Sequence, residues 1–440
     1  MTGVLTITDL REHVSPGTSR SGMEGSCSVI RLLRAERRFA RWALAEGVSM
    51  IGTAASIVIL PVLVYDLTGS AGLTGLVTAT RLVPYLFLGL VAGPVADRGN
   101  RRRLIIGGNL AEGLLAATIP VAAAFDALTV AQVFVVAILS AVAFVFSDAA
   151  VFGAVPSLVP GDQLAGANGL LASLSSVADV AGPVLGGVLI ATIGAEHALA
   201  FDSATFVFAA AVQLTIDSDF RRPGGPAGRP SIREQLGTAM RFVREQRTVL
   251  TLIVVGFGNS VAIGIVLGLL VPWSVEVLGY ERDDARLGVL YAGVGVGSLV
   301  AGLLFPRLFA PGRVAFLTPA SVAWSALMSA TLLAAITWLA PVAVAAFSFG
   351  IMLTITIGIT YRQLATPDHL VSTVNTLGRM IASGGQPLGA AVGASVAAAA
   401  TVSAAATAVL TATAVGALLA LRGRDTGLQS SPPGAASGGF

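Results

Sequence analysis

The sequence predicts an all-α membrane protein with twelve transmembrane helices arranged as two pseudo-symmetric six-helix bundles. Hydrophobic side chains make up 55% of the 440 residues, and Asp, Glu, Lys and Arg together only 12%. That is about half the charged fraction of an average soluble domain, so too little polar surface remains to cover a water-exposed globule. Twelve apolar stretches supply the helices, because about 20 residues at 1.5 Å each cross a hydrocarbon core of about 30 Å.

The apolar stretches form two groups of six. We expect helices over residues 39–65, 71–91, 104–124, 128–150, 165–190 and 198–216, and then over 248–269, 286–304, 314–336, 340–361, 374–396 and 400–421. The segment between the groups carries seven Arg and begins with a run rich in Pro and Gly. Its apolar residues Ile232, Leu236, Met240 and Val243 recur at helical spacing, which predicts an amphipathic helix on the inner membrane face.

Basic residues set the predicted orientation. All 27 are Arg, and 23 of them map to one side if both termini lie there, against only Arg282 and Arg286 on the other. By the positive-inside rule both termini are cytoplasmic in a multi-pass protein of the bacterial inner or plasma membrane. The predicted organisation is a disordered cytoplasmic tail at 1–35, an N-terminal bundle at 36–216, a cytoplasmic linker at 217–247, a C-terminal bundle at 248–424 and a disordered tail at 425–440.

Composition also excludes several kinds of chemistry. Without Lys the chain has neither a P-loop nor a Schiff-base amine. The single Cys27 lies in the polar tail, and the three histidines fall in the tail or in short loops, so we expect no catalytic residues, no cofactor and no metal site. A net charge of +3 is too small to indicate nucleic-acid binding.

The two halves are related by an internal repeat. VPGDQLAGANGLL from Val159 and TPDHLVSTVNTLG from Thr366 share a Pro, an Asp and a Leu, and each has an Asn eight residues after its Pro. Both segments lead into the fifth helix of their half. Parallel repeats of this kind are typical of transporters built from two related bundles.

The connection between the second and third predicted helices reads GPVADRGNRRRL. It resembles the loop motif of the major facilitator superfamily, with Asn100 at a turn position where that motif has Gly and where Asn also tolerates positive φ. The resemblance implies the major facilitator fold and a cytoplasmic latch, with Asp97 facing the N-terminus of the eleventh helix and Arg98 reaching Asp148. The predicted gate residues are Gly93, Asp97, Arg98, Arg101, Arg102 and Asp148.

The fifth predicted helix carries Gly182, Pro183, Gly186 and Gly187, which resemble the end of the antiporter motif of exporters in that superfamily. Pro interrupts the helical hydrogen-bond ladder and Gly allows a neighbouring backbone to approach, so a bend or a packing role would each account for them. The run from FVFSDAAVFG to AFDSATFVFAAA resembles the exporter branch that contains the enterobactin exporter and the macrolide-efflux proteins.

Ionisable residues inside predicted helices are functional candidates, because each costs about 2.5–3.5 kcal/mol to insert. We take Asp179, Glu46 and Glu112 as candidates for proton coupling, and Asp202 and Asp148 as structural. Arg81 serves either a structural pair with Asp179 or the coupling itself. Polar stripes at helical spacing predict a central cavity lined by Arg81, Ser49, Thr53 and Ser175, with Trp273, Tyr291, Trp324 and Phe349 as possible aromatic contacts.

These observations predict a secondary active transporter that exports an amphipathic small molecule, such as a drug, a siderophore or a natural product, by alternating access coupled to protons. Its partners are the substrate, protons and the lipid bilayer, and a monomer suffices for the mechanism. The alternatives are a nutrient importer of the same fold and a non-transporting membrane sensor or assembly protein.

Overall fold

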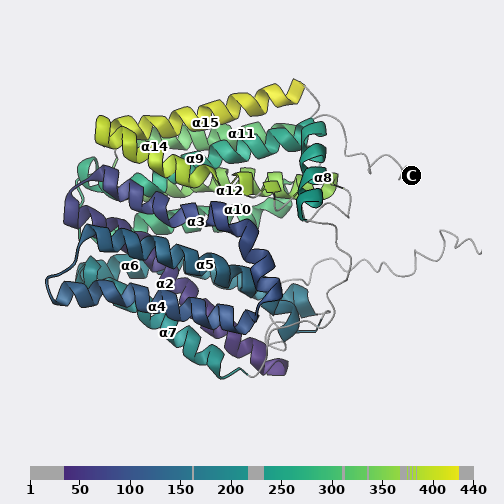
Figure 1. Ribbon diagram of the computed structural model, residues 1–440. Helices are drawn as coiled ribbons and strands as arrows, with labels where there is room; N and C mark the ends of the chain where they lie inside the picture. The colour runs from purple at the N-terminus through teal and green to yellow at the C-terminus, as the bar shows by residue number, and fades with distance from the viewer. Residues whose placement is uncertain are drawn as a thin grey trace, which may run out of the picture.

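The computed structural model describes residues 34–160, 163–216, 232–309, 313–333, 336–366, 374, 377–378, 380–382 and 384–425. Within these ranges the chain is helical apart from short connections. Figure 1 shows the helices running side by side along one direction, with the N-terminal helices below and the C-terminal helices above.

Six helices form the N-terminal half. They are α2 (Arg37–Thr68), α3 (Ala71–Arg98), α4 (Arg101–Ala124), α5 (Val130–Leu158), α6 (Leu164–Ile193) and α7 (Ala195–Leu214). The C-terminal half contains α9 (Arg247–Glu276), α10 (Arg286–Leu308), α11 (Val314–Leu333), α12 (Ala340–Ala365), α14 (Gly385–Ala399) and α15 (Val402–Asp425). Nine helices of the described chain are long and apolar enough to span a membrane.

Local sequence explains several helix boundaries. Ser70, Asn100 and Thr129 cap the N-termini of α3, α4 and α5, each accepting a backbone N–H bond of 3.1–3.2 Å from the third residue on. Gly69 ends α2 at φ +61°, a left-handed conformation that glycine adopts without a side-chain clash. Asn100 has φ −84° and therefore does not adopt the positive φ that we considered for this turn. Its side chain caps the N-terminus of α4 instead.

The helix α8 (Ile232–Glu245) crosses the end of the C-terminal half (Figure 1). Its buried residues Ala239 and Val243 join a core with Leu252, Leu353 and Tyr361 of the bundle. The apolar side of the amphipathic helix therefore packs, at these positions, against the protein rather than resting free on a lipid surface. We call this end of the molecule the linker end and the opposite end the far end.

The two halves meet along pairs of helices from corresponding positions. In the interface α3 packs against α14 and α9, and α6 packs against α10. Within the N-terminal half α2 packs mainly on α6 and α7, and α4 on α5 and α7. The second and fifth helices of one half thus face the fifth and second helices of the other, which makes the interface pseudo-symmetric.

Among the residues that the structure describes, the hydrophobic core is shared between the halves toward the far end. There one cluster joins residues of both halves, for example Ile59 and Ile190 with Leu270 and Leu287. Toward the linker end the core divides into two clusters, one around Phe39 and Trp42 and one around Ile253. The halves are therefore packed together at the far end and have separate cores at the linker end.

Glycine contacts produce the close approach at the far end. A β-carbon on Gly187 of α6 would lie 2.9 Å from Cα of Gly288 on α10, and one on Gly75 of α3 would lie 2.8 Å from Cβ of Ala394 on α14. Real β-carbons do not approach neighbours so closely, so side chains at these positions would force the halves apart. We call these two contacts the far-end seam.

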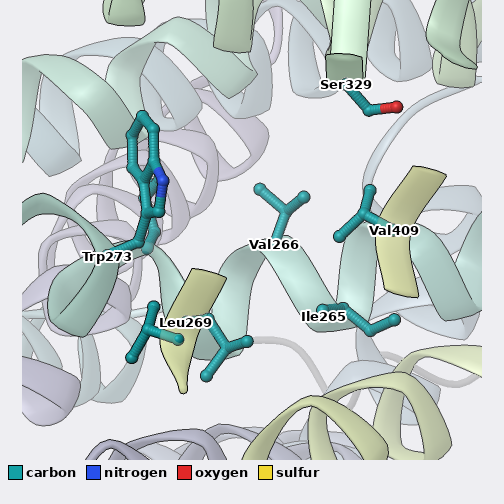
Figure 2. A pocket seen from close by; sticks show the side chains of 8 residues that line it. Ile265, Val266, Leu269, Trp273, Ser329 and Val409 are labelled. Carbon is teal, nitrogen blue, oxygen red and sulfur yellow. The ribbon is translucent and has the colours of Figure 1, made fainter. Parts of the chain in front are cut away.

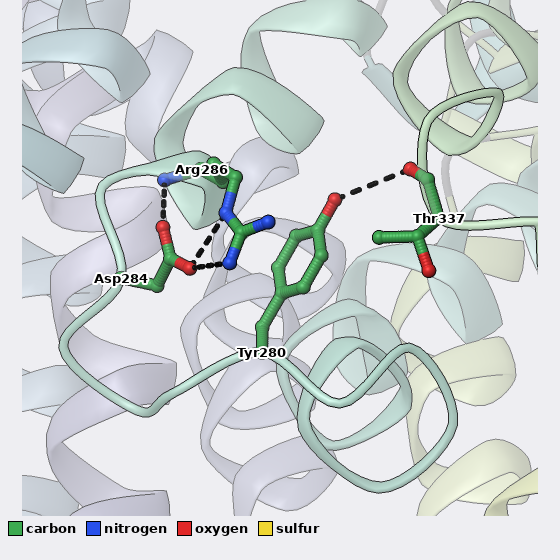
Figure 3. Close-up of polar contacts among 4 residues, drawn as sticks. All are labelled: Tyr280, Asp284, Arg286 and Thr337. Carbon is green, nitrogen blue, oxygen red and sulfur yellow. Dashed lines mark hydrogen bonds and ion pairs between the residues drawn. The ribbon is translucent and has the colours of Figure 1, made fainter.

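The loop between α9 and α10 is held by its own side chains (Figure 3). Arg286 pairs with Asp284 at 2.5 Å and lies 4.3 Å over the ring of Tyr280, whose hydroxyl donates to the carbonyl oxygen of Thr337 at 3.3 Å. This hydrogen-bonded guanidinium holds the pKa of Asp284 below its usual value, whereas burial raises the pKa of Tyr280. The loop is thereby fixed to the C-terminal half.

Candidate functional site

A polar cluster lies at mid-depth inside the N-terminal half, around Arg81 of α3. The Arg81 Nη1 donates a hydrogen bond of 3.0 Å to the backbone oxygen of Ser56, and the Ser56 hydroxyl donates at 2.5 Å to Oδ2 of Asp202 on α7. Glu112 of α4 completes the group. Asp202 and Glu112 are the carboxylates whose negative charges act on Arg81. Four helices of one half therefore converge on one guanidinium.

The cluster contains more carboxylate than cation. Glu112 and Asp202 are only 5% and 6% exposed. Within the described chain, Oε1 of Glu112 and Oδ1 of Asp202 have no hydrogen-bond donor. Arg cannot lose its proton in a protein, so two ionised carboxylates would leave this buried group with a net charge of −1. Buried charge without a partner is costly, and the arrangement therefore has room for one additional proton or hydrogen-bond donor.

Arg81 and Glu112 open onto a cavity of about 280 Å³ between α2, α3, α5 and α9. Thr53 also lines it, with its hydroxyl donating to Ser49 O at 3.0 Å, while Ser49 is 5% exposed and bonds to Glu46 O. A smaller adjoining pocket of about 40 Å³ reaches Asp202. Of the predicted cavity residues, Arg81 and Thr53 therefore line this space, while Ser49 bonds within its own helix.

A second polar group lies between this cluster and the linker end. Asn109 donates to the side-chain oxygen of Gln213 at 2.8 Å, and Gln213 donates to Oε2 of Glu46 at 3.4 Å. Glu46 is electrostatically coupled to Asp148 on one side and to Glu112 on the other. The ionisable groups of the N-terminal half thus form a series from the middle of the bundle toward the linker end.

Asp179 lies elsewhere. It is on the interface side of α6 and lines a cavity of about 710 Å³ between α6 and α10, whereas Arg81 lines a separate cavity that Leu267 of α9 also borders. The Arg81–Asp179 ion pair considered from sequence is therefore not formed, since the charged neighbours of Arg81 are Asp202 and Glu112. Ser175, one turn before Asp179, is half-buried and is not one of the residues lining either cavity.

The predicted gate motif surrounds the connection between α3 and α4. Gly93, Asp97 and Arg98 belong to α3, but their side chains lie outside the described part of the structure, so the contacts expected of Asp97 and Arg98 remain predictions. Arg102 donates at 2.8 Å to the backbone oxygen of Leu214, which ties the start of α4 to the end of α7. Arg101 and Asp148 both have interaction partners.

The Gly and Pro residues of α6 lie where this continuous helix packs against α2 on one side and α10 on the other. α6 runs from Leu164 through Pro183 to Ile193. β-carbons on Gly182 and Gly186 would lie 2.9 Å and 2.8 Å from backbone oxygens of Ile51 and Ala55 on α2, and Gly187 faces α10. Close packing against both halves accounts for these positions.

The C-terminal half has a cavity of a different kind (Figure 2). It measures about 30 Å³ and is lined by Ile265, Val266, Leu269, Leu270 and Trp273 of α9 together with Ser329, Val402 and Val409. Apart from one serine its walls are apolar, and its volume is close to that of a single water molecule. Trp273 therefore belongs to the core rather than to a substrate cavity.

Sequence analysis did not identify the contacts of several residues in and around these two polar groups. We interpreted Asp202 as structural because of its place near a helix end, yet it is hydrogen-bonded within the Arg81 cluster. Gln213 and Asn109 gave no periodic signal. Tyr291 of α10 is 2% exposed, bonds to Leu267 O at 3.1 Å and is electrostatically coupled to Arg81 across the interface. For Asp202, the adjacent polar residues Asp202 and Ser203 within an apolar helix were the feature of the sequence that could have indicated a buried polar contact.

Comparison with solved structures agrees with this architecture. A bacterial homologue of the lysosomal transporter Spinster, in an inward-facing and occupied conformation, superposes with a TM-score of 0.69 at 15% identity, covering 89% of this chain and 97% of that one. The nucleoside transporter NupG (D323A mutant) gives a TM-score of 0.75 at 10% identity over 88% of this chain and 99% of that one. At these identities the similarity is one of fold.

Sequence comparison points to the same group of proteins. The chain is 31% identical over 211 residues to the multidrug efflux pump Tap of Mycobacterium tuberculosis, covering 46% of this chain and 49% of that protein. It is 23% identical over 215 residues to macrolide efflux protein A of Streptococcus pyogenes, covering 49% and 53%. The chain thus spans about half the length of these relatives. Residues 42–390, most of the chain, match the family description Major Facilitator Superfamily, and the protein therefore belongs to that family.

Proposed function

We propose that the protein is a secondary active transporter of the cell membrane that exports an amphipathic small molecule in exchange for protons. Family membership supports transport, and the names of the similar proteins, a multidrug efflux pump and a macrolide efflux protein, favour export. The observation that carries the coupling is the Arg81 cluster, in which two buried carboxylates share one guanidinium beside a cavity.

Coupling follows from the charge balance of that cluster. One proton on Glu112 or Asp202 brings the group to neutrality, and its loss restores a buried negative charge. Substrate in the adjoining cavity and the proton then influence each other through the shared guanidinium, which is the linkage that exchange requires. Glu46, with Gln213 and Asp148, extends the series of ionisable and polar groups toward the linker end and offers a route for the proton.

The Arg distribution orients the cycle. The linker end, which contains α8, the start of α2 and the end of α15, faces the cytoplasm, because most Arg residues of the sequence map to that side. The arrangement described above then corresponds to an inward-facing state, because the described residues of the two halves form a common core at the far end and separate cores at the linker end. Rocking of the halves about the interface would part the far-end seam and join the linker ends. A single chain contains the complete set of elements, so a monomer suffices.

The test is proton-driven efflux of a fluorescent amphipathic dye from cells with and without the protein, before and after addition of an uncoupler. Glu112→Gln and Asp202→Asn should each abolish uncoupler-sensitive efflux at normal abundance. Asp126→Asn, in an exposed loop at the far end, serves as the charge-matched control. Wild-type efflux in both cluster variants would contradict this coupling site, and gradient-dependent uptake in place of efflux would identify an importer.

A further inference from the structure

The cavity between α6 and α10 is the largest of those described above, at about 710 Å³. It lies on the interface between the halves, in a position that both halves line, and Met352 of α12 contributes to its wall. This volume falls within the range of about 300–1,000 Å³ typical of small-molecule sites. The cavity is distinct from the Arg81 cavity and contains no residue of that cluster.

Asp179 is the single ionisable residue among those lining this space. Its side chain is exposed to the cavity, and within the described chain no hydrogen bond or ion pair engages its carboxylate. A carboxylate at membrane depth is costly without a partner of opposite charge. A cationic ligand in this cavity would supply that charge.

The serines of the cavity reinforce this polarity. Ser173 and Ser176 donate their hydroxyl protons to carbonyl oxygens of their own helix, both at 2.9 Å. Ser348 donates to Val294 O at 2.8 Å, so the 3.1 Å contact between the hydroxyls of Ser298 and Ser348 uses the proton of Ser298. The hydroxyl protons of all three lining serines are therefore used in hydrogen bonds within the protein, and these hydroxyls can act only as acceptors toward a ligand.

We propose that this cavity binds the protonated amine of an amphipathic substrate, with Asp179 as the counter-ion. The acceptor-only lining of Asp179, Ser173, Ser176 and Ser298 matches an ammonium group, which has donors and no acceptor. The apolar part of the ligand packs against Val180, Leu299, Leu303 and Met352. A carboxylate or phosphate ligand finds no donor side chain among these residues.

This assignment rests on the proposed function and divides the work between two cavities. The Arg81 cluster exchanges the proton, while Asp179 selects substrates that carry a positive charge. Asp179 is then a specificity-determining residue and not the proton carrier. The two roles separate experimentally, because a proton carrier is needed for every substrate whereas a counter-ion is needed only for cationic ones.

Direct binding tests the site without relying on transport. Full-length protein in lipid nanodiscs is titrated with naphthylethylammonium and with its near-isosteric neutral analogue naphthylethanol, each followed by naphthalene fluorescence. Asp179→Asn should weaken binding of the ammonium by about tenfold or more, the usual loss for a charge-assisted hydrogen bond, and change that of the alcohol by less than about twofold. Asp179→Glu should recover part of the ammonium affinity, and Asp126→Asn should leave both unchanged.

Three results would overturn the proposal: equal affinity of the wild type for the two probes, unchanged ammonium binding in Asp179→Asn, or equal loss of both probes in that variant. The same variants are then assayed for efflux. If Asp179→Asn exports the alcohol and not the ammonium, the counter-ion role stands. If the wild type binds the ammonium selectively but exports neither probe, the site stands and the proposed transport function fails.

Discussion

Tyr65 on α2 donates a hydrogen bond of 2.9 Å to Oε1 of Glu276 on α9, and this contact joins the two halves at the far end. Arg282, in the loop that follows α9, lies 5.1 Å over the Tyr65 ring and is electrostatically coupled to Asp66. The brace formed by Asp284, Arg286 and Tyr280 holds this loop in place (Figure 3). The only two Arg residues that we assigned to this side thus have separate tasks: Arg282 contacts the opposite half and Arg286 fixes the loop.

Removal of the Tyr65 hydroxyl should loosen the far end. Tyr65→Phe retains the ring under Arg282 but loses a hydrogen bond to a carboxylate, worth about 1.5–3 kcal/mol. We expect a cysteine at Ala394, which is 5% exposed in the seam, to react at least severalfold faster with a membrane-impermeant maleimide in a Cys27→Ser background. Tyr280→Phe is the matched control, because its bond to Thr337 stays within one half. Equal labelling of the two variants would show that the bond does not hold the halves together.

A methyl group in the far-end seam should shift the protein away from the state described above. A β-carbon on Gly288 would lie 3.0 Å from Cα of Gly187, so Gly288→Ala disfavours closure at the far end. Spin labels placed on the far ends of α6 and α10 should report a longer distance between the halves. Gly258→Ala on α9, where a β-carbon meets nothing within 4 Å, should give the wild-type distance. No change in Gly288→Ala would mean that α10 yields without parting the halves.

Loss of Arg81 should destabilise the N-terminal half. Arg81→Met removes the positive charge that acts on the buried Glu112 and Asp202, and buried carboxylates without a nearby cation are costly. We expect lower abundance and a lower unfolding temperature of the purified protein, with partial recovery when Asp202→Asn is added. Adding Asp179→Asn instead should restore nothing, because Asp179 lines a different cavity. Recovery by Asp179→Asn would reinstate the pairing considered from sequence.

Acid should release the brace of the loop between α9 and α10. Arg286 holds the pKa of Asp284 below its usual value, so the pairing is complete above the unfolded pKa of about 3.9 and is lost as pH falls through the lower folded value. The Arg286 amide donates to Asp284 at 2.8 Å, and hydrogen exchange at this amide should lose protection only in that acidic range. Asp284→Ala should lack protection at every pH. Protection that is independent of pH and of Asp284 would contradict the brace.

The helices were predictable because insertion into a bilayer imposes a local rule on length and polarity. The predicted starts at residues 71, 286, 314 and 340 coincide with α3, α10, α11 and α12. The predicted ends at 91, 150 and 269 fall seven or eight residues short of the ends of α3, α5 and α9, because those helices continue beyond their apolar stretches. The predicted helix start at residue 374 lies in a segment that is largely outside the described chain. Fold class and element order thus follow from composition and span length.

The partners of buried charges were not predictable in the same way. Arg81 and Asp202 are 121 positions apart and are linked through Ser56 because α3 and α7 both pack against α2. Helical spacing identified the stripe containing Ser175 and Asp179 but could not tell which side of α6 meets α2 and which meets α10. Pairing depends on tertiary packing, and a single sequence carries no periodic signal for that.

The far-end seam has a consequence for release. At the seam contacts themselves, the surface that parting of the halves would expose is bare backbone and a methyl group, from Gly187, Gly288, Gly75 and Ala394. Such a surface offers a departing solute few side-chain atoms to hold, in contrast to the carboxylate and serine oxygens of the cavity beneath it. If the protein exports a solute as proposed, the seam contacts themselves would bind it weakly, and the polar side chains it would meet at the far end are those of Tyr65, Glu276 and Arg282.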